Sequence, residues 1–476
     1  MPPTSPNTYV LQVFLITAPA FILYGYNQAG LSALLDLPVV ARLFPPIDTV
    51  LTSGSQEQTN STKQGAVNAC FQLGALIGSL SCSYFRDAWR RHKTILMAAV
   101  LALIGQVLQA CSFELAQFIV GRLILGLGVG QLSVMVPLRQ SESSKSRNRG
   151  RQVITAGMFI CVGFSLSSWI DFGCSKVPYG SIQWRLPLAL PCACSISIAA
   201  SIMTFPESPR WLGTRHATNN LFQLKDDGSR LWWRFTLCML IQLFQQTCRG
   251  NLISIYTTEI FGTNLGLSGD LPRILAATSL TWKLLCSFIA FAGIDRLGRR
   301  RVFIISGGMA TCMIVMAIAT SFPTSNTAAS ITAAGFIFIF SLCYPIGVLG
   351  GNFLYCNKIA PAHLRAAMSS VSTANHWLWN FVITMITPPA LPSIGWKYYI
   401  VFACISSCIP AVVYFFFPET SHRSLEAIEQ LFRDAPTIWQ IVPMARDLPR
   451  GELPPAFVAP ELKKDEGTHE EHREWA

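Results

Sequence analysis

Apolar residues of this chain are gathered into long runs that short polar stretches separate. A helix that crosses a membrane needs about 20 mostly apolar residues. The runs predict such helices at about 9–30, 65–85, 95–113, 116–137, 153–172, 187–205, 231–256, 274–294, 302–322, 331–355, 366–388 and 396–417. We therefore expect an all-α membrane protein with twelve transmembrane helices.

The second half of the chain repeats charge clusters of the first half. Asp87 and Arg91 are matched by Asp295 and Arg299, at the same spacing and after a corresponding apolar run. This repetition predicts two pseudo-symmetric six-helix bundles, 1–205 and 231–432, joined by a short cytoplasmic linker at 206–230. Duplicated bundles of this kind bind solute between their halves, near the middle of the bilayer. The polar stretch 433–476 predicts a disordered cytoplasmic tail.

Composition agrees with a protein surrounded by lipid. Hydrophobic residues make up 51% of the chain and charged residues only 13%, whereas soluble domains carry about 25% charged residues. The net charge of +11 lies in short loops between apolar runs, which indicates topology-setting charge and no nucleic-acid partner. No nucleophile–base pair, metal-ligand cluster or Gly-rich phosphate loop is evident. We expect neither an enzyme nor a bound cofactor.

Loop charges predict the orientation of the chain in the membrane. Numbering the predicted segments in chain order, the loops between segments 2 and 3, 4 and 5, and 8 and 9 are rich in Lys and Arg. The loops between segments 3 and 4 and between 9 and 10 carry none. Because positive loops stay in the cytoplasm, both termini are expected there, with the plasma membrane as the expected location. The first exterior loop then holds Asn60-Ser61-Thr62, a sequon that predicts glycosylation of Asn60.

Polar residues at membrane depth are candidates for function because burying them in lipid is costly. Gln242, Gln245 and Gln246 share one face of the seventh segment, and a break at Gly250 would turn Asn251 towards the same side. Amides both donate and accept hydrogen bonds, which suits a hydroxylated solute. The alternative is that these amides hold helices together.

Two other segments carry polar groups of the same kind. His376, Trp377 and Asn380 lie on the eleventh segment, with Trp377 and Asn380 on one face. An aromatic ring suits the apolar C–H face of a sugar, although anchoring at the lipid interface is the alternative for Trp377. Tyr24, Asn27 and Gln28 share a face of the first segment. We expect the amides of the seventh and eleventh segments to face shared water-lined space, not each other.

Four motifs in this order resemble the sugar porter branch of the major facilitator superfamily. They are Gly121-Arg122 with Gly126, Gly128 and Gly130; Pro206-Glu207-Ser208-Pro209-Arg210-Trp211-Leu212; Asp295-Arg296-Leu297-Gly298-Arg299-Arg300; and Pro418-Glu419-Thr420 with Leu425-Glu426. The resemblance covers about 20–432 and includes fungal hexose, polyol and quinate permeases. It implies alternating-access transport of a sugar or a related polyhydroxylated solute.

The resemblance also assigns roles to residues. It implies that solute is bound by Gln242, Gln245, Gln246, Asn251, Trp377 and Asn380, with Phe353 where the family usually has a second Trp. Proton-coupled members often have Asp at the position of Asn27, close to Arg122. Since Asn27 cannot titrate, facilitated diffusion is favoured, and proton symport remains the alternative.

Several residues depart from the family pattern. Gly157 replaces a Gln that contacts sugar, Arg249 replaces a glycine, and Lys283 places a charge inside the eighth segment. Two added cations favour an acidic solute such as quinate as a rival to hexose. An exporter of a secondary metabolite, a non-transporting sugar sensor and an inactive carrier are further alternatives.

The cytoplasmic charge clusters are altered as well. In the resembling family, acidic residues after the fourth and tenth segments pair with arginines of the opposite half when the inner side closes. Glu142 is retained and is expected to meet Arg299, but Lys358 stands where the second acid belongs, facing Arg91. Like charges should weaken this seal. The sequence therefore predicts a resting state that is biased towards inward-open.

Overall fold

The computed structural model describes residues 10–447, apart from 36, 89–90, 144–148, 179, 206–227, 229, 249, 265, 268, 298–303, 305–306, 324, 350, 362–363, 421–422 and 424. The elements assigned within these residues are all helices, which confirms the predicted all-α class. The predicted linker lies almost wholly outside the described residues.

The first half contains η1 (Val13–Thr17), α2 (Ala18–Leu35), α3 (Pro38–Leu43), η2 (Pro45–Ile47), α4 (Ser55–Ala88), α5 (Arg91–Ala110), α6 (Leu115–Ser143), α7 (Arg149–Ser175), α8 (Ile182–Ala189), α9 (Cys192–Ser201) and η3 (Ile202–Thr204). The second half contains α11 (Leu231–Thr247), α12 (Gly250–Ile255), α13 (Thr257–Glu259), η4 (Ile260–Asn264), α14 (Leu271–Leu297), α16 (Gly307–Ser321), α17 (Thr327–Tyr344), η5 (Pro345–Leu349), α18 (Gly351–Ile359), α19 (Arg365–Ile394) and α20 (Lys397–Phe416).

Each predicted transmembrane segment overlaps described helix. Nine helical stretches among the described residues are long and apolar enough to cross a membrane, and they match the predicted segments 1–6, 8, 10 and 12. The seventh segment is divided into α11 and α12, and the described part of the ninth, α16, is short. The eleventh, α19, is long enough but carries many polar residues. These exceptions include the two segments predicted to bind solute.

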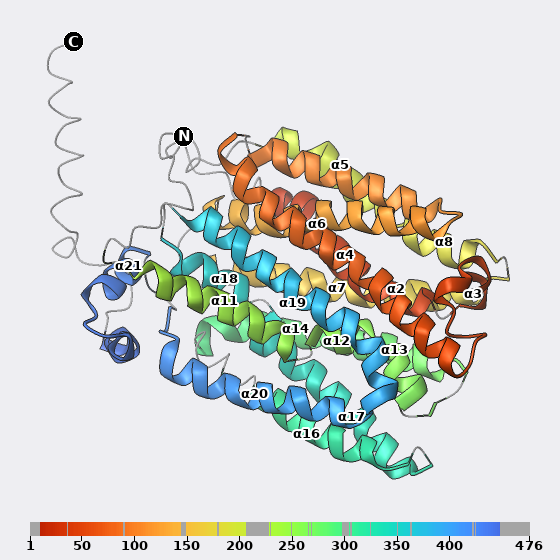
Figure 1. The fold of residues 1–476 in the computed structure, drawn as a ribbon. Helices are drawn as coiled ribbons and strands as arrows, with labels where there is room; N and C mark the ends of the chain where they lie inside the picture. The colour runs from red at the N-terminus through yellow and green to blue at the C-terminus, as the bar shows by residue number, and fades with distance from the viewer. Residues whose placement is uncertain are drawn as a thin grey trace, which may run out of the picture.

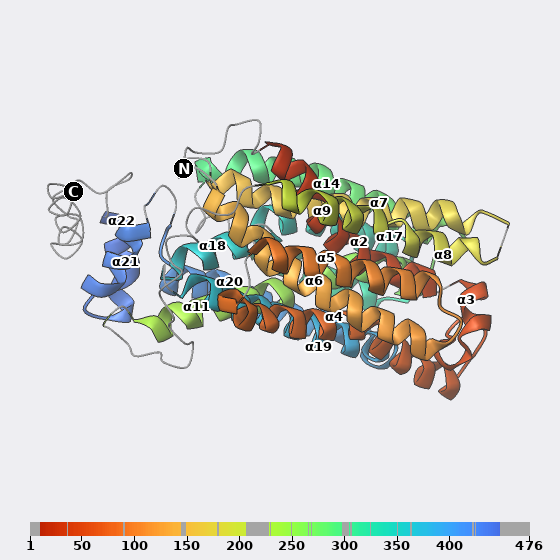
Figure 2. The ribbon, with the colours of Figure 1, turned by 90° about the horizontal axis from the view of Figure 1, so that it is seen from above.

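The long helices run side by side in one elongated bundle (Figure 1). Within the first half α2 packs on α7 and α5 on α6, while α4 packs on α19 and α7 on α14 across the two halves. One end of the bundle carries α3 and the start of α8, and the opposite end carries α21 and α22 (Figure 2). We refer to these as the α3 end and the α21 end.

Glycines allow two helices of the first half to pack backbone against backbone. A side chain at Gly126 of α6 would collide with the carbonyl oxygen of Phe71 on α4, and one at Gly130 would collide with that of Ala75. Such small residues four apart are typical of close helix pairs in membranes. The glycine motif therefore serves helix packing, as its spacing predicts.

The tail is more ordered than the sequence predicts. α21 (Leu425–Asp434) is followed by η6 (Ile438–Gln440) and α22 (Ile441–Asp447). Ile441 is fully buried, and the Trp439 ring lies 4.9 Å from the Phe416 ring of α20. The prediction of disorder from 433 was wrong up to Asp447, because apolar residues in a polar stretch cover the end of α20. Residues 448–476 lie outside the description.

Asn60 was predicted to lie in an exposed loop, and the structure corrects this. It lies in the first turns of α4 with only 1% of its surface exposed. Its Nδ2 atom, which would carry a glycan, donates a hydrogen bond to the Asp48 backbone carbonyl at 2.8 Å. The folded protein therefore offers no accessible amide for glycosylation here.

Candidate functional site

The seventh segment is interrupted in the middle of the bundle. α11 ends at Thr247 and α12 begins at Gly250, where any side chain would overlap the ring of Tyr344. The Lys283 ammonium of α14 donates to the Gly250 carbonyl oxygen at 3.5 Å and to the Ser254 hydroxyl. A glycine and a buried cation thus accommodate the break, and interrupted helices of this kind surround transporter sites.

Two amides of α11 bind an asparagine that sequence reasoning missed. Asn352 Nδ2 donates to Gln242 Oε1 at 2.7 Å and to Gln245 Oε1. Asn352 lies near the start of α18, just after the π-helical turn η5, a distortion common at functional sites. Its position after Gly350-Gly351 in an apolar run was the signal that could have found it.

His376 joins the two halves of the molecule at the same level. Its Nε2 atom lies 2.8 Å from the Tyr24 hydroxyl oxygen of α2 and 2.8 Å from Gln246 Nε2 of α11. Its Nδ1 atom lies 3.1 Å from Gln245 Oε1. Gln245 and Gln246 of α11 thus bind an imidazole of α19, while Asn380 Oδ1 accepts from Thr384 of its own helix. Shared water-lined space between the two segments stays a prediction.

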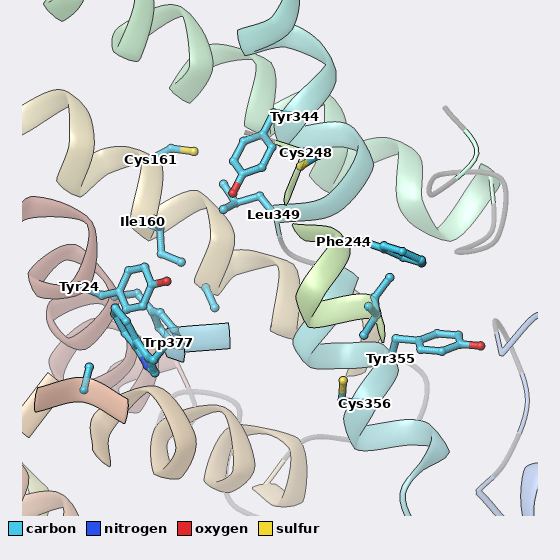
Figure 3. Packing of buried hydrophobic residues seen from close by; sticks show 14 of the residues in the cluster. Tyr24, Ile160, Cys161, Phe244, Cys248, Tyr344, Leu349, Tyr355, Cys356 and Trp377 are labelled. Carbon is cyan, nitrogen blue, oxygen red and sulfur yellow. The ribbon is translucent and has the colours of Figure 1, made fainter. Parts of the chain in front are cut away.

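Trp377 lies at the centre of the interface between the halves. It is completely buried, and its ring centroid lies 5.0 Å from that of Tyr24 and 5.7 Å from that of Phe71. Figure 3 shows Trp377 lying against Tyr24. The indole Nε1 donates to Ser133 Oγ of α6 at 3.2 Å. Complete burial among first-half residues excludes the lipid-anchor alternative.

The buried Arg122 of α6 is bound by a residue of α4. Its Nη2 atom donates to the Asn68 backbone carbonyl at 3.2 Å and to Asn68 Oδ1 at 3.1 Å, and its guanidinium lies 5.0 Å from the Phe71 ring. Asn27 instead donates to Leu23 of its own helix. Asn68 therefore holds Arg122, which has no ion-pair partner among the described residues.

A second polar chain crosses between the halves next to Arg122. Asn68 Nδ2 donates to the Tyr256 hydroxyl at 3.3 Å, and that hydroxyl donates to the Thr384 carbonyl of α19 at 3.0 Å. Thr384 Oγ1 donates to Asn380 Oδ1 at 3.3 Å. Asn68, Tyr256 and Thr384 were missed because short polar residues in apolar helices are common, and their meeting depends on tertiary packing.

Some buried amide atoms of this network lack a partner within the described residues. They are both polar atoms of the Gln28 side chain, Asn380 Nδ2 and Asn352 Oδ1. Gln28 and Asn380 are only 1% and 2% exposed. Gln28 follows Tyr24 by one helical turn and Asn380 follows Trp377 by one turn, both towards the α3 end. Unmet donors and acceptors thus flank the aromatic contact on both halves.

Two of the residues that depart from the family pattern, Lys283 and Gly157, are described by the structure, and the third, Arg249, is not. Lys283 is buried, with its ammonium 4.2 Å and 4.8 Å from the ring centroids of Tyr344 and Phe164, and it forms no ion pair among the described residues. Gly157 is buried within α7. Arg249 and the side chains of Asn251 and Phe353 lie outside the description.

Most of the charge clusters also lie outside the described side chains, namely those of Asp87, Glu142, Asp295 and Arg299. Arg91 is half-buried. Lys358 donates to the Thr420 carbonyl at 3.0 Å and to the Arg423 carbonyl at 3.5 Å. Backbone carbonyls of its own half therefore bind the Lys358 charge.

The described conformation is closed around the network. Gln242, Gln246, Trp377 and Asn380 are all buried, so solvent does not reach these side chains from either end. A cavity between α6, α11, α18 and α19, lined by Ser133, Gln242 and Ser372 among others, has a volume of about 10 Å³, room for about one water. The described residues therefore enclose the network in this conformation. The bias of the resting population towards inward-open stays a prediction.

Comparisons with known proteins agree with this architecture. A family model described as "Sugar (and other) transporter" matches residues 13–220 and 213–432. The sugar transporter STL1 of Saccharomyces cerevisiae is 29% identical over 466 residues, which is 89% of this chain and 81% of the relative. The MFS-type transporter oryC of Aspergillus oryzae is 31% identical over 461 residues, 87% of this chain and 84% of the relative.

A solved structure confirms the fold. The major facilitator superfamily proton:xylose symporter XylE, bound to 6-bromo-6-deoxy-D-glucose, superposes with a TM-score of 0.77 at 21% identity. The match covers 90% of this chain and all of the XylE chain. The resemblance predicted from the four motifs is thus confirmed, and the chain is a multi-pass membrane protein.

Proposed function

Because the chain belongs to the sugar (and other) transporter family of the major facilitator superfamily, we propose that it carries a hexose, a polyol or a related polyhydroxylated solute across the membrane by alternating access. The relatives named above include a sugar transporter. Facilitated diffusion and proton symport both fit this proposal. Its location is the plasma membrane, with the α21 end and both termini in the cytoplasm.

The observation that carries the proposal is the pair of unmet amides beside the central aromatic contact. Gln28 on one half and Asn380 on the other are buried without a complete set of hydrogen bonds. A buried polar group left unpaired costs about 1–3 kcal/mol. Solute hydroxyls would form the missing hydrogen bonds with these groups. Binding would then remove the cost of leaving them unpaired.

Solute recognition also uses the residues already bonded to one another. Gln242, Gln245, Gln246, Asn251 and Asn380 supply amides, and Trp377 and Phe353 supply aromatic faces. In the closed state Asn352 and His376 occupy several of these amides. Solute hydroxyls would replace those partners when the halves separate, because amides exchange one neutral partner for another at little net cost.

Alternating access is expected to exchange the contacts between halves. Ligand pockets for small molecules have volumes of about 300–1,000 Å³, far more than the cavity beside Gln242. The halves must therefore move apart at one end to admit solute. The cytoplasmic end would be held closed, as the resembling family implies, by Asp87, Arg91, Glu142, Asp295 and Arg299. Lys358 and Arg122 would instead bind groups of their own halves.

An acidic solute such as quinate is the second candidate. Lys283 is a buried cation that forms no ion pair among the described residues, and it lies beside the break of the seventh segment. A solute carboxylate in reach of this ammonium would gain a charge-assisted hydrogen bond. Arg249, which directly precedes Gly250, would add to this preference.

Uptake of labelled solutes by a transport-deficient yeast tests the proposal. The panel contains hexoses, polyols and quinate, each at two pH values and with or without a protonophore. Uptake of a neutral member that Asn380→Ala weakens supports sugar or polyol transport. Uptake of quinate alone, lost in Lys283→Met, supports the acidic candidate. A well-expressed protein that moves none of these solutes contradicts both.

A further inference from the structure

A carboxyl group is buried in α7, the fifth membrane segment, away from the network described above. Asp171 lies near the end of α7 that points to the α3 end and is only 5% exposed. Its Oδ2 atom accepts a hydrogen bond from Ser167 Oγ at 3.3 Å. Its Oδ1 atom has no partner within the described residues. A carboxyl in a membrane segment with half of its hydrogen bonds unmet is a candidate for function.

The groups around Asp171 do not neutralise it by an ion pair. On α2, Gly30 packs so closely that a side chain there would lie 3.2 Å from Asp171 Oδ2, and the Tyr26 hydroxyl donates to the Pro187 carbonyl. Cys174 follows on α7 itself. On α14, the half-buried Arg273 borders the same cavity but forms no ion pair with Asp171 among the described residues.

Asp171 borders a cavity that both halves of the molecule form. Ala29 and Ala33 of α2 and Ser168 of α7 line it from the first half, and Ser254, Thr257 and Arg273 line it from the second. Glu259, on the same short helix as Thr257, is half-buried. The cavity volume is about 10 Å³, so about one water fits when the halves are closed.

Because this cavity lies between the halves, its size must change during alternating access. When the α3 end opens, water reaches Asp171, and the ionised carboxylate is hydrated. When that end closes, the carboxyl returns to a space for about one water. Moving an unpaired carboxylate from water into such surroundings costs far more than moving the neutral acid. Closure is therefore easier after the carboxyl has taken up a proton.

We propose that Asp171 is a proton-binding site through which external acid favours closure of the α3 end. The inference rests on the proposed transport function, which places that end outside the cell. A proton that binds the closed state better than the open state shifts the population towards closure. Acid then stimulates uptake without any proton being carried inwards, since Asp171 lies near the outer end of its helix.

The proposal separates stimulation of uptake by external acid from accumulation of solute driven by a pH difference. Uptake rises with external acid when closure of the outer end limits the cycle, because protonation favours that step. Protonation of Asp171 by itself does not let a pH difference drive solute accumulation, because no step of this inference delivers the Asp171 proton to the cytoplasm. Since one proton is bound, the closure equilibrium changes at most about tenfold per pH unit.

Thiol labelling measures closure without relying on transport. Ala33→Cys is labelled in intact cells with a membrane-impermeant maleimide across a pH series, in the wild-type and Asp171→Asn backgrounds. Labelling of the protein without Ala33→Cys is subtracted. The ratio between backgrounds at each pH cancels the pH dependence of the thiol reaction. We expect labelling in the wild-type background to fall several-fold at acid pH relative to Asp171→Asn. A constant ratio overturns the proposal.

Uptake supplies the second measurement, with two control variants. Asp171→Asn should transport at a rate independent of external pH. Ser167→Ala removes the hydrogen bond to Oδ2 but leaves the carboxyl, and Asp270→Asn removes an exposed carboxyl at the same end; both should keep the pH dependence. Unchanged pH dependence in Asp171→Asn contradicts the inference. If no solute is transported, the proposed function fails, while the labelling ratio still decides the proton site.

Discussion

Replacing Asn380 by alanine should weaken solute binding and leave the stability of the solute-free protein nearly unchanged. The substitution removes a buried Nδ2 donor that has no partner and one 3.3 Å hydrogen bond that Thr384 donates. Losing the unmet donor stabilises the protein and losing the bond destabilises it, by about 1 kcal/mol each. These two effects oppose one another.

Solute binding lacks this compensation. A neutral hydrogen bond contributes about 0.5–1.5 kcal/mol net, which corresponds to about a 2- to 13-fold increase in Kd. Asn375→Ala is the matched control, because Asn375 lies on the same helix but already donates to the Met239 carbonyl at 3.0 Å. It should lower stability by about 0.5–1.5 kcal/mol and leave Kd unchanged.

Thermal unfolding of the purified protein over a series of solute concentrations measures both quantities. The melting temperature without solute reports stability, and its rise with solute reports Kd, because a ligand stabilises only the state that binds it. The reasoning is refuted if Asn380→Ala lowers the melting temperature as much as Asn375→Ala while the two variants bind solute equally well.

Three further predictions concern helix packing and the ends of the bundle. Gly250→Ala should reduce the yield of folded protein on size-exclusion chromatography, since the added methyl group overlaps the Tyr344 ring and overpacking costs about 1–3 kcal/mol. Lys176 and Asp270, an exposed ion pair that joins the halves, should show a coupling of about 0.2–1 kcal/mol in a double-mutant cycle of thermal stability, and added salt should reduce it. Ile441→Asp should lower the melting temperature, because the side chain is fully buried in α22.

Two control variants accompany these predictions. Gly335→Ala adds a methyl group on α17 where no atom lies within 4 Å, so the yield should match wild type; an equal loss in both glycine variants would contradict the packing argument. Ile438→Asp changes a side chain that is 37% exposed, and its melting temperature should fall less than that of Ile441→Asp. An equal fall would show that α22 does not pack as described.

Hydrogen bonds between the halves set the work of opening. Tyr24 with His376, Trp377 with Ser133, and Asn68 with Tyr256 each join residues from opposite halves. Each such bond contributes about 0.5–1.5 kcal/mol net, and bonds at one end must break when that end opens. Solute hydroxyls bound at the same level would replace some of them, which explains how solute lowers the cost of the conformational change.

The chain by itself determined the class, the segments and the position of the helix break. Apolar run length, helical periodicity and glycine are local properties, so the apolar helical segments and an interruption next to Gly250 follow from consecutive residues. The motifs likewise fixed the family, because each motif is contiguous. Two local interpretations were exceptions. Asn60 was placed in an exterior loop from topology and a sequon, and the stretch 433–447 was judged by its polar composition, yet both pack against neighbours.

Tertiary structure decided which polar side chains meet. Tyr24 and His376 are 352 residues apart in sequence, and no periodicity relates them. Arg122 of α6 meets Asn68 of α4, and Asn352 of α18 joins the glutamines of α11. Asp171 became a candidate only when packing showed that its Oδ1 atom has no partner. Periodicity within a helix gives the face on which a residue lies. The helix that packs against that face is distant in sequence, so only the folded structure identifies it.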